Sequence, residues 1–96
     1  MAVHISQHPL VQHKLTLMRH IGSKPKKFRE VVREISQFLL YEATADLPLI
    51  PRPIETPLAP MQGVEIGARI GLIPILRAGL GMVEPIIDLL PTARVW

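Results

Sequence analysis

The run Ile-Gly-Leu-Ile-Pro-Ile-Leu at residues 70–76 constrains the fold of this chain more than any other feature. It contains no charged side chain, which is typical of a strand buried on both faces, as in a parallel sheet. Residues 77–81 interrupt the run, residues 82–90 have helical apolar spacing, and residues 93–96 look like the start of another strand. This order predicts an unfinished βαβ unit. The chain is therefore expected to be an α/β protein, and its buried strand needs neighbours that the 96 residues do not supply.

Two helices are predicted ahead of that unit. The first begins near His8–Pro9, because proline suits a first helical position, and ends at Gly22. The second is amphipathic and runs from about residue 25 to about residue 44. Its apolar stripe consists of Phe28, Val31, Val32, Ile35, Phe38 and Leu39. A single stripe of this kind needs a surface to pack against.

The segment Leu47–Pro60 contains five prolines, a density that excludes a helix and a central strand. Extended or edge-strand backbone is expected, as a loose hairpin that turns near residues 57–63. The apolar content of the segment favours an arm that lies on a neighbour over a solvated linker. A polyproline ligand for an SH3-like partner, suggested by residues 50–57, is the weaker interpretation.

Composition excludes several classes of protein. Hydrophobic residues make up 48% and charged residues 20%, which indicates a folded chain. The absence of cysteine excludes a disulfide scaffold, thiolate metal ligands and a thiol nucleophile. No apolar stretch is long enough to cross a membrane, and no secretory signal is visible, so a cytoplasmic protein is expected.

Charge is concentrated at the N-terminal end, where residues 1–33 hold seven Lys and Arg side chains and one acid. Nucleic-acid binding is one interpretation, but no aromatic side chains are interleaved to stack on bases, which favours a solvated helix face. His4, His8, His13 and His20 lack the spacing of a metal site. Glu84 and Asp88 are expected to be solvated, and Glu42 and Asp46 receive no catalytic role.

The strongest candidate for a functional site is the segment of residues 74–82, Pro-Ile-Leu-Arg-Ala-Gly-Leu-Gly-Met. Here a buried strand ends and a helix begins, and helix N-termini attract anions. Gly79 and Gly81 allow backbone to approach a ligand, and the Arg77 guanidinium suits phosphate oxygens. A phosphate or diphosphate cradle is one interpretation, and an ordinary tight strand-to-helix turn is the other. Neither the Walker motif nor the dinucleotide fingerprint is present.

Three segments in the same order resemble the uracil phosphoribosyltransferases. Residues 74–82 are similar to the diphosphate loop of that family, residues 8–19 to its N-terminal helix, and residues 41–48 to the end of its second helix. The resemblance implies the N-terminal part of a type I phosphoribosyltransferase fold: two helices, a proline-rich arm or hood strands, and the start of a parallel sheet. Residues 1–96 would form an incomplete portion of one such domain.

The resemblance also implies a function, which is transfer of phosphoribosyl from 5-phosphoribosyl 1-diphosphate to uracil, giving UMP and diphosphate in pyrimidine salvage. Arg77, Ala78 and Gly79 match the loop that binds the diphosphate of the donor. Magnesium bound with the donor, a homo-oligomer and GTP as an effector are further implications, and neither membrane nor nucleic acid is expected as a partner.

The sequence lacks other parts of the family pattern. The acidic loop that binds the ribose phosphate and the uracil-recognition segment do not occur, and a second basic donor-site residue would fall just past Trp96. The 96-residue chain alone is therefore expected to be inactive. A non-catalytic anion-binding or oligomerisation fragment is the alternative, and a basic RNA-binding module is a third possibility.

Overall fold

The computed structural model describes residues 3–95 of the chain, apart from the side chain of Ala78. Helix α1 spans Pro9–Arg19 and helix α2 spans Pro25–Ala43, and both begin with proline at a first-turn position. The predicted helix starts are thus confirmed. The first helix ends earlier than expected, because His20 has extended backbone and its ring Nδ1 accepts a hydrogen bond from the Gly22 N–H at 2.9 Å.

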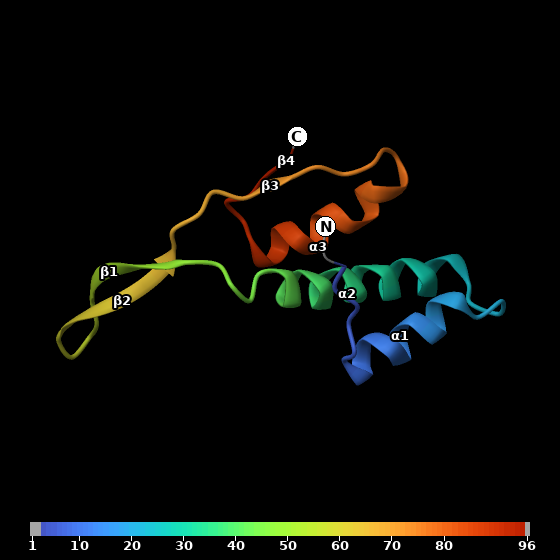
Figure 1. Ribbon diagram of the computed structural model, residues 1–96, viewed down its shortest axis with the longest axis horizontal. Helices are drawn as coiled ribbons and strands as arrows, with labels where there is room; N and C mark the ends of the chain where they lie inside the picture. Colours follow the sequence, from blue (N-terminus) through green and yellow to red (C-terminus); the bar gives the residue numbers. More distant parts are fainter. Residues whose placement is uncertain (1–2, 96) are drawn as a thin grey trace.

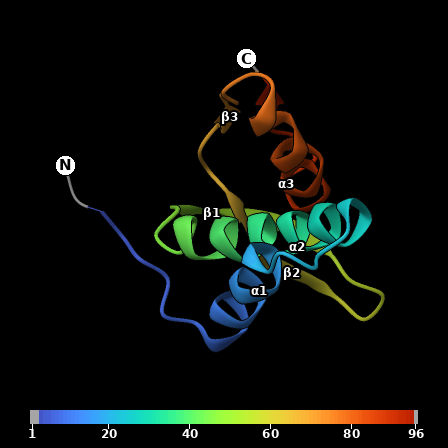
Figure 2. The ribbon, with the colours of Figure 1, turned by 90° about the vertical axis from the view of Figure 1, so that its right-hand side faces the viewer.

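Helix α2 is the centre of the molecule, with α1 on one side and α3 (Val83–Leu89) on the other, as Figures 1 and 2 show. The buried apolar side chains are Val11 on α1 and Val31 and Ile35 on α2. Phe28 and Leu39 of the predicted stripe are 45% and 39% exposed, because the two neighbouring helices cover only part of it. The core is small, as expected for a chain of this length.

The proline segment forms an antiparallel hairpin of β1 (Leu49–Glu55) and β2 (Pro60–Ile66). Pro51 and Pro53 are two residues apart, so their backbone nitrogens face the same edge of β1. When that edge faces away from β2, the missing N–H groups remove no hydrogen bond between the two strands. The hairpin is confirmed, but it turns at residues 56–59, where the Thr56 N–H donates to the Ala59 carbonyl at 3.0 Å. Gly63, which was expected in the turn, lies within β2.

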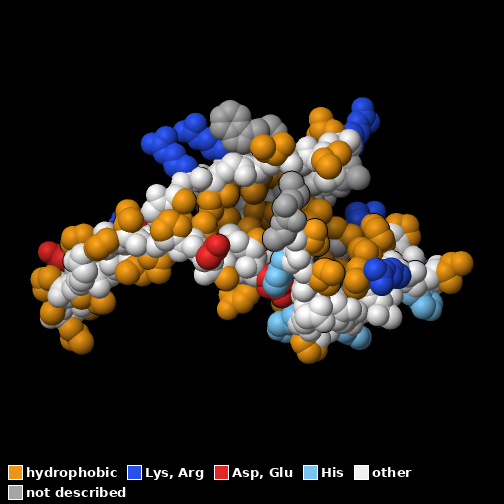
Figure 3. All heavy atoms as spheres, viewed as in Figure 1, with side chains coloured by type: hydrophobic (Ala, Val, Ile, Leu, Met, Phe, Trp, Pro, Cys, Tyr) orange, Lys and Arg blue, Asp and Glu red, His pale blue; other side chains and the backbone are white. Residues whose placement is uncertain are grey.

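The hairpin projects from the helices as an arm (Figure 1), and hydrophobic side chains are spread along it in Figure 3. Its large apolar side chains are exposed on both strands and in the turn between them: Leu49, Ile50, Ile54, Leu58, Met61, Val64 and Ile66. Two strands alone cannot cover both of their faces, so this arm presents apolar surface.

The βαβ unit is confirmed in outline. Strand β3 (Gly71–Leu72) leads to a short 3₁₀ helix η1 (Ala78–Met82), to α3, and to β4 (Arg94–Val95), which pairs parallel to β3. Trp96, which was expected in the second strand, lies outside the described residues. Pro85 is buried in the first turn of α3, where a missing N–H is tolerated.

The predicted buried strand over residues 70–76 is wrong in extent and in burial. Only two of its residues are in β3, and Ile73, Ile75 and Leu76 are 82%, 85% and 72% exposed. Within residues 3–95, β4 is the sole strand that pairs with β3, so the faces that the apolar pattern requires to be covered remain open. No described helix has the length and apolarity that a membrane crossing requires.

Candidate functional site

Arg77 lies beyond the carboxyl end of β3 and immediately before η1. Its side chain is exposed, and no ion pair joins its guanidinium to any other described residue. The peptide bond that precedes it, Leu76–Arg77, is cis. Ligands of open α/β sheets bind at the carboxyl ends of the strands, so this cation is placed where such a ligand would be expected.

The backbone of the loop forms hydrogen bonds within itself. The Gly79 N–H donates to the Ile75 carbonyl at 2.8 Å, and the Leu80 N–H donates to the Arg77 carbonyl at 3.0 Å. These two N–H groups are therefore occupied in this conformation, whereas Gly79 was expected to offer its N–H to an anion. Ala78 is the first residue of η1, a position at which N–H groups have no acceptor inside the helix.

Helix α2 faces the same loop. A hollow of about 430 Å³ separates the N-terminal half of α2 from η1 and α3, with Gly81 and Glu84 on one wall. Lys26, Arg29 and Arg33 are on the other wall together with the acid Glu30, so α2 presents three cations and one carboxylate across from the loop. From the sequence, these cations are assigned to a solvated helix face, and no sequence spacing joins them to residues 74–82.

The expectation that Glu84 and Asp88 are solvated is confirmed, since their side chains are 85% and 54% exposed, and both acids also contact α2. Arg33 of α2 bridges them: its Nη2 is 2.5 Å from an Asp88 carboxylate oxygen, and its Nη1 is 3.6 Å from a Glu84 carboxylate oxygen. One turn along α2, the Gln37 side-chain amide donates to the Pro85 carbonyl at 3.2 Å. Helices α2 and α3 are thus joined by polar contacts beside the loop.

The histidines near the N-terminus have structural partners. Glu42 near the end of α2 accepts a hydrogen bond from the Ser6 hydroxyl at 2.7 Å, and its other oxygen is 3.2 Å from His4 Nε2. The Ser6 hydrogen bond is the main cause that lowers the pKa of Glu42, and His4 and His8 lower it further. His8 also stacks on Phe38, with ring centroids 6.2 Å apart. Among residues 3–95, no three His, Asp or Glu side chains gather as a metal site would require.

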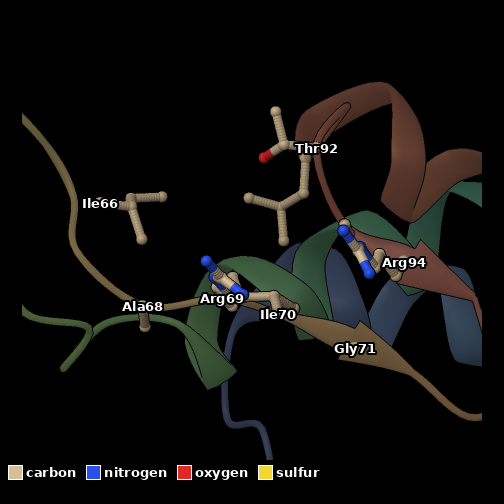
Figure 4. A pocket seen from close by; sticks show the side chains of 9 residues that line it. Ile66, Ala68, Arg69, Ile70, Gly71, Thr92 and Arg94 are labelled. Atoms are coloured by element: carbon tan, nitrogen blue, oxygen red, sulfur yellow. The ribbon is translucent and has the colours of Figure 1, made fainter.

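A second hollow, of about 580 Å³, lies at the amino ends of β3 and β4 (Figure 4). Arg69 and Arg94 line it, brought to the same edge because the Arg94 N–H donates to the Ile70 carbonyl at 3.0 Å. Sequence reasoning missed this pairing. It lies at the opposite end of the strands from Arg77, away from the edge where α/β sheets bind ligands, so the Arg77 loop remains the candidate site.

The fold first defines a class: an α/β chain in which two helices and a hairpin precede a parallel β–helix–β unit. The same arrangement occurs in a solved structure titled "Structure of AQ2163 protein from Aquifex aeolicus", with a TM-score of 0.88 and 32% sequence identity. That match covers 99% of this chain and 46% of the other. The family model for uracil phosphoribosyltransferase matches residues 5–96. The chain therefore belongs to the uracil phosphoribosyltransferase family.

Curated relatives agree with this family. The uracil phosphoribosyltransferase of Roseiflexus sp. (strain RS-1) is 71% identical over 94 residues, which cover 98% of this chain and 45% of that protein. The uracil phosphoribosyltransferase of Desulfitobacterium hafniense (strain DSM 10664 / DCB-2) is 52% identical over 94 residues, with 97% of this chain and 45% of that protein covered. The chain thus spans about 45% of the length of these relatives and matches their N-terminal portion.

Proposed function

We propose that this chain is the N-terminal part of a single uracil phosphoribosyltransferase domain. The complete enzyme would transfer the phosphoribosyl group of 5-phosphoribosyl 1-diphosphate to N1 of uracil, releasing UMP and diphosphate in pyrimidine salvage. Two observations support this proposal. The family model matches residues 5–96, and the exposed Arg77 guanidinium lies at the carboxyl end of β3.

The proposed role of Arg77 follows from the charge that the reaction generates. In the transfer, the bond between C1′ and the diphosphate oxygen breaks, its electron pair leaves with the diphosphate, and uracil N1 bonds to C1′ and loses its proton. Negative charge therefore develops on the departing group. A guanidinium already placed there stabilises that charge through two parallel hydrogen bonds. Arg77 is suited to this role because no described carboxylate pairs with it.

Ala78 and Gly79 are proposed to add backbone contacts to the same anion. The Ala78 N–H is at the start of η1, where a donor has no partner within the helix. The Gly79 N–H would first have to leave the Ile75 carbonyl, so its contribution requires a change in the loop.

Magnesium does not fit this loop as a resident ion. The charged side chain of the loop is a cation, and the described part of the chain contains no cluster of three acidic or histidine side chains. Hard cations of this kind are held by oxygen ligands. Magnesium would thus arrive with the donor, as the family resemblance implies, and this chain's own part is to hold the diphosphate.

The 96-residue chain is proposed to lack activity by itself, since it spans about 45% of the length of its relatives. The alternative is a non-catalytic fragment for anion binding or oligomerisation. The exposed apolar hairpin favours an oligomeric assembly in which the arm packs on a second copy. GTP as an effector stays a prediction.

Calorimetric titration with inorganic diphosphate and with 5-phosphoribosyl 1-diphosphate tests the role of Arg77. Arg77→Ala is expected to weaken binding by about tenfold or more, the effect of losing one charge-assisted contact. Arg69→Ala removes the same charge at the opposite end of β3 and is expected to change affinity by about twofold or less. Equal losses in the two variants would mean that only net charge matters. Formation of UMP from uracil by the unmodified chain at enzyme-like rates would contradict its proposed inactivity.

A further inference from the structure

Two side chains of α2 hold α3, the helix that follows the Arg77 loop. The Arg33 guanidinium lies between Asp88, at 2.5 Å, and Glu84, at 3.6 Å, and these two acids are one turn apart on α3. Gln37, one turn further along α2, donates to the Pro85 carbonyl at 3.2 Å. Arg33 therefore contacts both turns of α3, through Glu84 and Asp88, and Gln37 contacts the first turn at the buried Pro85.

Arg77 is connected to α3 without an intervening flexible segment. The 3₁₀ helix η1 begins directly after Arg77 and ends at Met82, and α3 begins at the next residue. The Leu80 N–H donates to the Arg77 carbonyl, and the Val83 N–H donates in turn to the Leu80 carbonyl. Because this connection is hydrogen-bonded at each step, a displacement of α3 is transmitted to the backbone of Arg77.

The other side of the loop offers much less support. The segment between β3 and Arg77 exposes Ile73, Ile75 and Leu76, and the described pairing of β3 with β4 is limited to two residues. The contacts of α2 with η1 and α3 are therefore the main support of the loop in this structure.

We propose that Arg33 and Gln37 are positioning residues for the anion-binding loop, and that they act through α3 and η1 rather than by touching the ligand. This inference depends on the proposed function, in which Arg77 binds the diphosphate of the donor. Accurate placement matters because a displacement of about 1 Å in a positioned group can cost large factors in rate or affinity.

The test compares Arg33→Ala and Gln37→Met with the control Arg29→Ala. Arg29 is one turn away on the same helix and lines the same hollow, but no described residue forms an ion pair with it. Gln37→Met keeps the length of the side chain and removes the donor. The measurements are amide hydrogen exchange at Leu80 and the affinity for inorganic diphosphate, both on the full chain.

Arg33→Ala and Gln37→Met are each expected to speed exchange at Leu80 by about twofold to fivefold, the range for partly exposed polar contacts. Diphosphate affinity is expected to fall by a similar factor, whereas Arg29→Ala changes both measurements by less than about twofold. The exchanged pair, Arg33→Asp with Asp88→Arg, is expected to recover the affinity that Arg33→Asp alone loses. Because the exchange also restores the original total charge, recovery of diphosphate affinity counts for the positioning role only together with recovery of slow exchange at Leu80, which depends on the contact between α2 and α3.

The outcomes separate this inference from the proposed role of Arg77. Unchanged exchange at Leu80 in both α2 variants would overturn the positioning role, whatever Arg77 does. Faster exchange with unchanged diphosphate affinity, while Arg77→Ala still weakens binding, would overturn it as well and leave the proposed function intact. If the unmodified chain binds no diphosphate, the ligand role of Arg77 fails, and the exchange data alone show whether α2 holds the loop.

Discussion

Replacing Val31 with alanine should destabilise the chain far more than the same change at Val64. Val31 of α2 is 1% exposed, whereas Val64 of β2 is 67% exposed. Val→Ala removes two methyl groups, and each buried group of this size contributes about 0.8 kcal/mol, so the transfer term at Val31 is about 1.6 kcal/mol. A cavity left between the helices adds to this, giving about 2 kcal/mol in all. At Val64 the change should remain within about 0.5 kcal/mol.

Urea unfolding followed by far-ultraviolet circular dichroism provides the measurement. For a chain of this size, total stability of about 5–14 kcal/mol and a urea slope of about 1–2 kcal/mol/M are typical. Val31→Ala should therefore lower the midpoint by about 1–2 M, and Val64→Ala by less than about 0.5 M. Equal shifts in the two variants would refute the reasoning, because they would mean that the contacts around α2 contribute no more than an exposed strand position.

Two further predictions concern acid stability and close backbone approach. The pKa of Glu42 is lowered from 4.5, chiefly by the Ser6 hydroxyl, so its stabilising effect is fully present above 4.5 and lost as the pH falls through the lower value. Ser6→Ala should raise that pKa in an NMR carboxyl titration, and an unchanged value would contradict the contact. Gly67→Ala should cost about 1 kcal/mol or more in urea unfolding, because its Cβ would be 2.7 Å from the Ile50 side chain. Gly81→Ala, with no atom within 4 Å, should change stability by less than about 0.5 kcal/mol, and equal costs would refute the steric argument.

The sequence predicts the elements whose causes are local. Pro9 and Pro25 each start a helix where the missing N–H costs nothing, and the proline-rich segment forms a hairpin because its prolines can face one outer edge. Apolar periodicity likewise identified Val31 and Ile35 as core residues. These signals require only a residue and its near neighbours in the chain.

Features that depend on distant segments were predicted poorly. The bridge from Arg33 to Asp88 joins residues 55 positions apart, and no spacing rule links them. The hydrogen bond that occupies the Gly79 N–H depends on how the backbone turns after Ile75, which residue types alone do not specify. The apolar pattern of residues 70–76 indicates a strand that should be covered on both faces. Whether the strand is buried depends on which neighbouring strands and helices are present.

The exposed segment before Arg77 explains why the α2 contacts should matter to the site. Covering Ile73, Ile75 and Leu76 would contribute about 1.5–3 kcal/mol for each side chain, a sum comparable with the whole stability of a small domain. While these side chains are exposed, that energy does not hold the loop, and the contacts of Arg33 and Gln37 with α3 carry a larger share of its placement. Any neighbour that covers the segment should therefore reduce the effect of Arg33→Ala on Leu80 exchange.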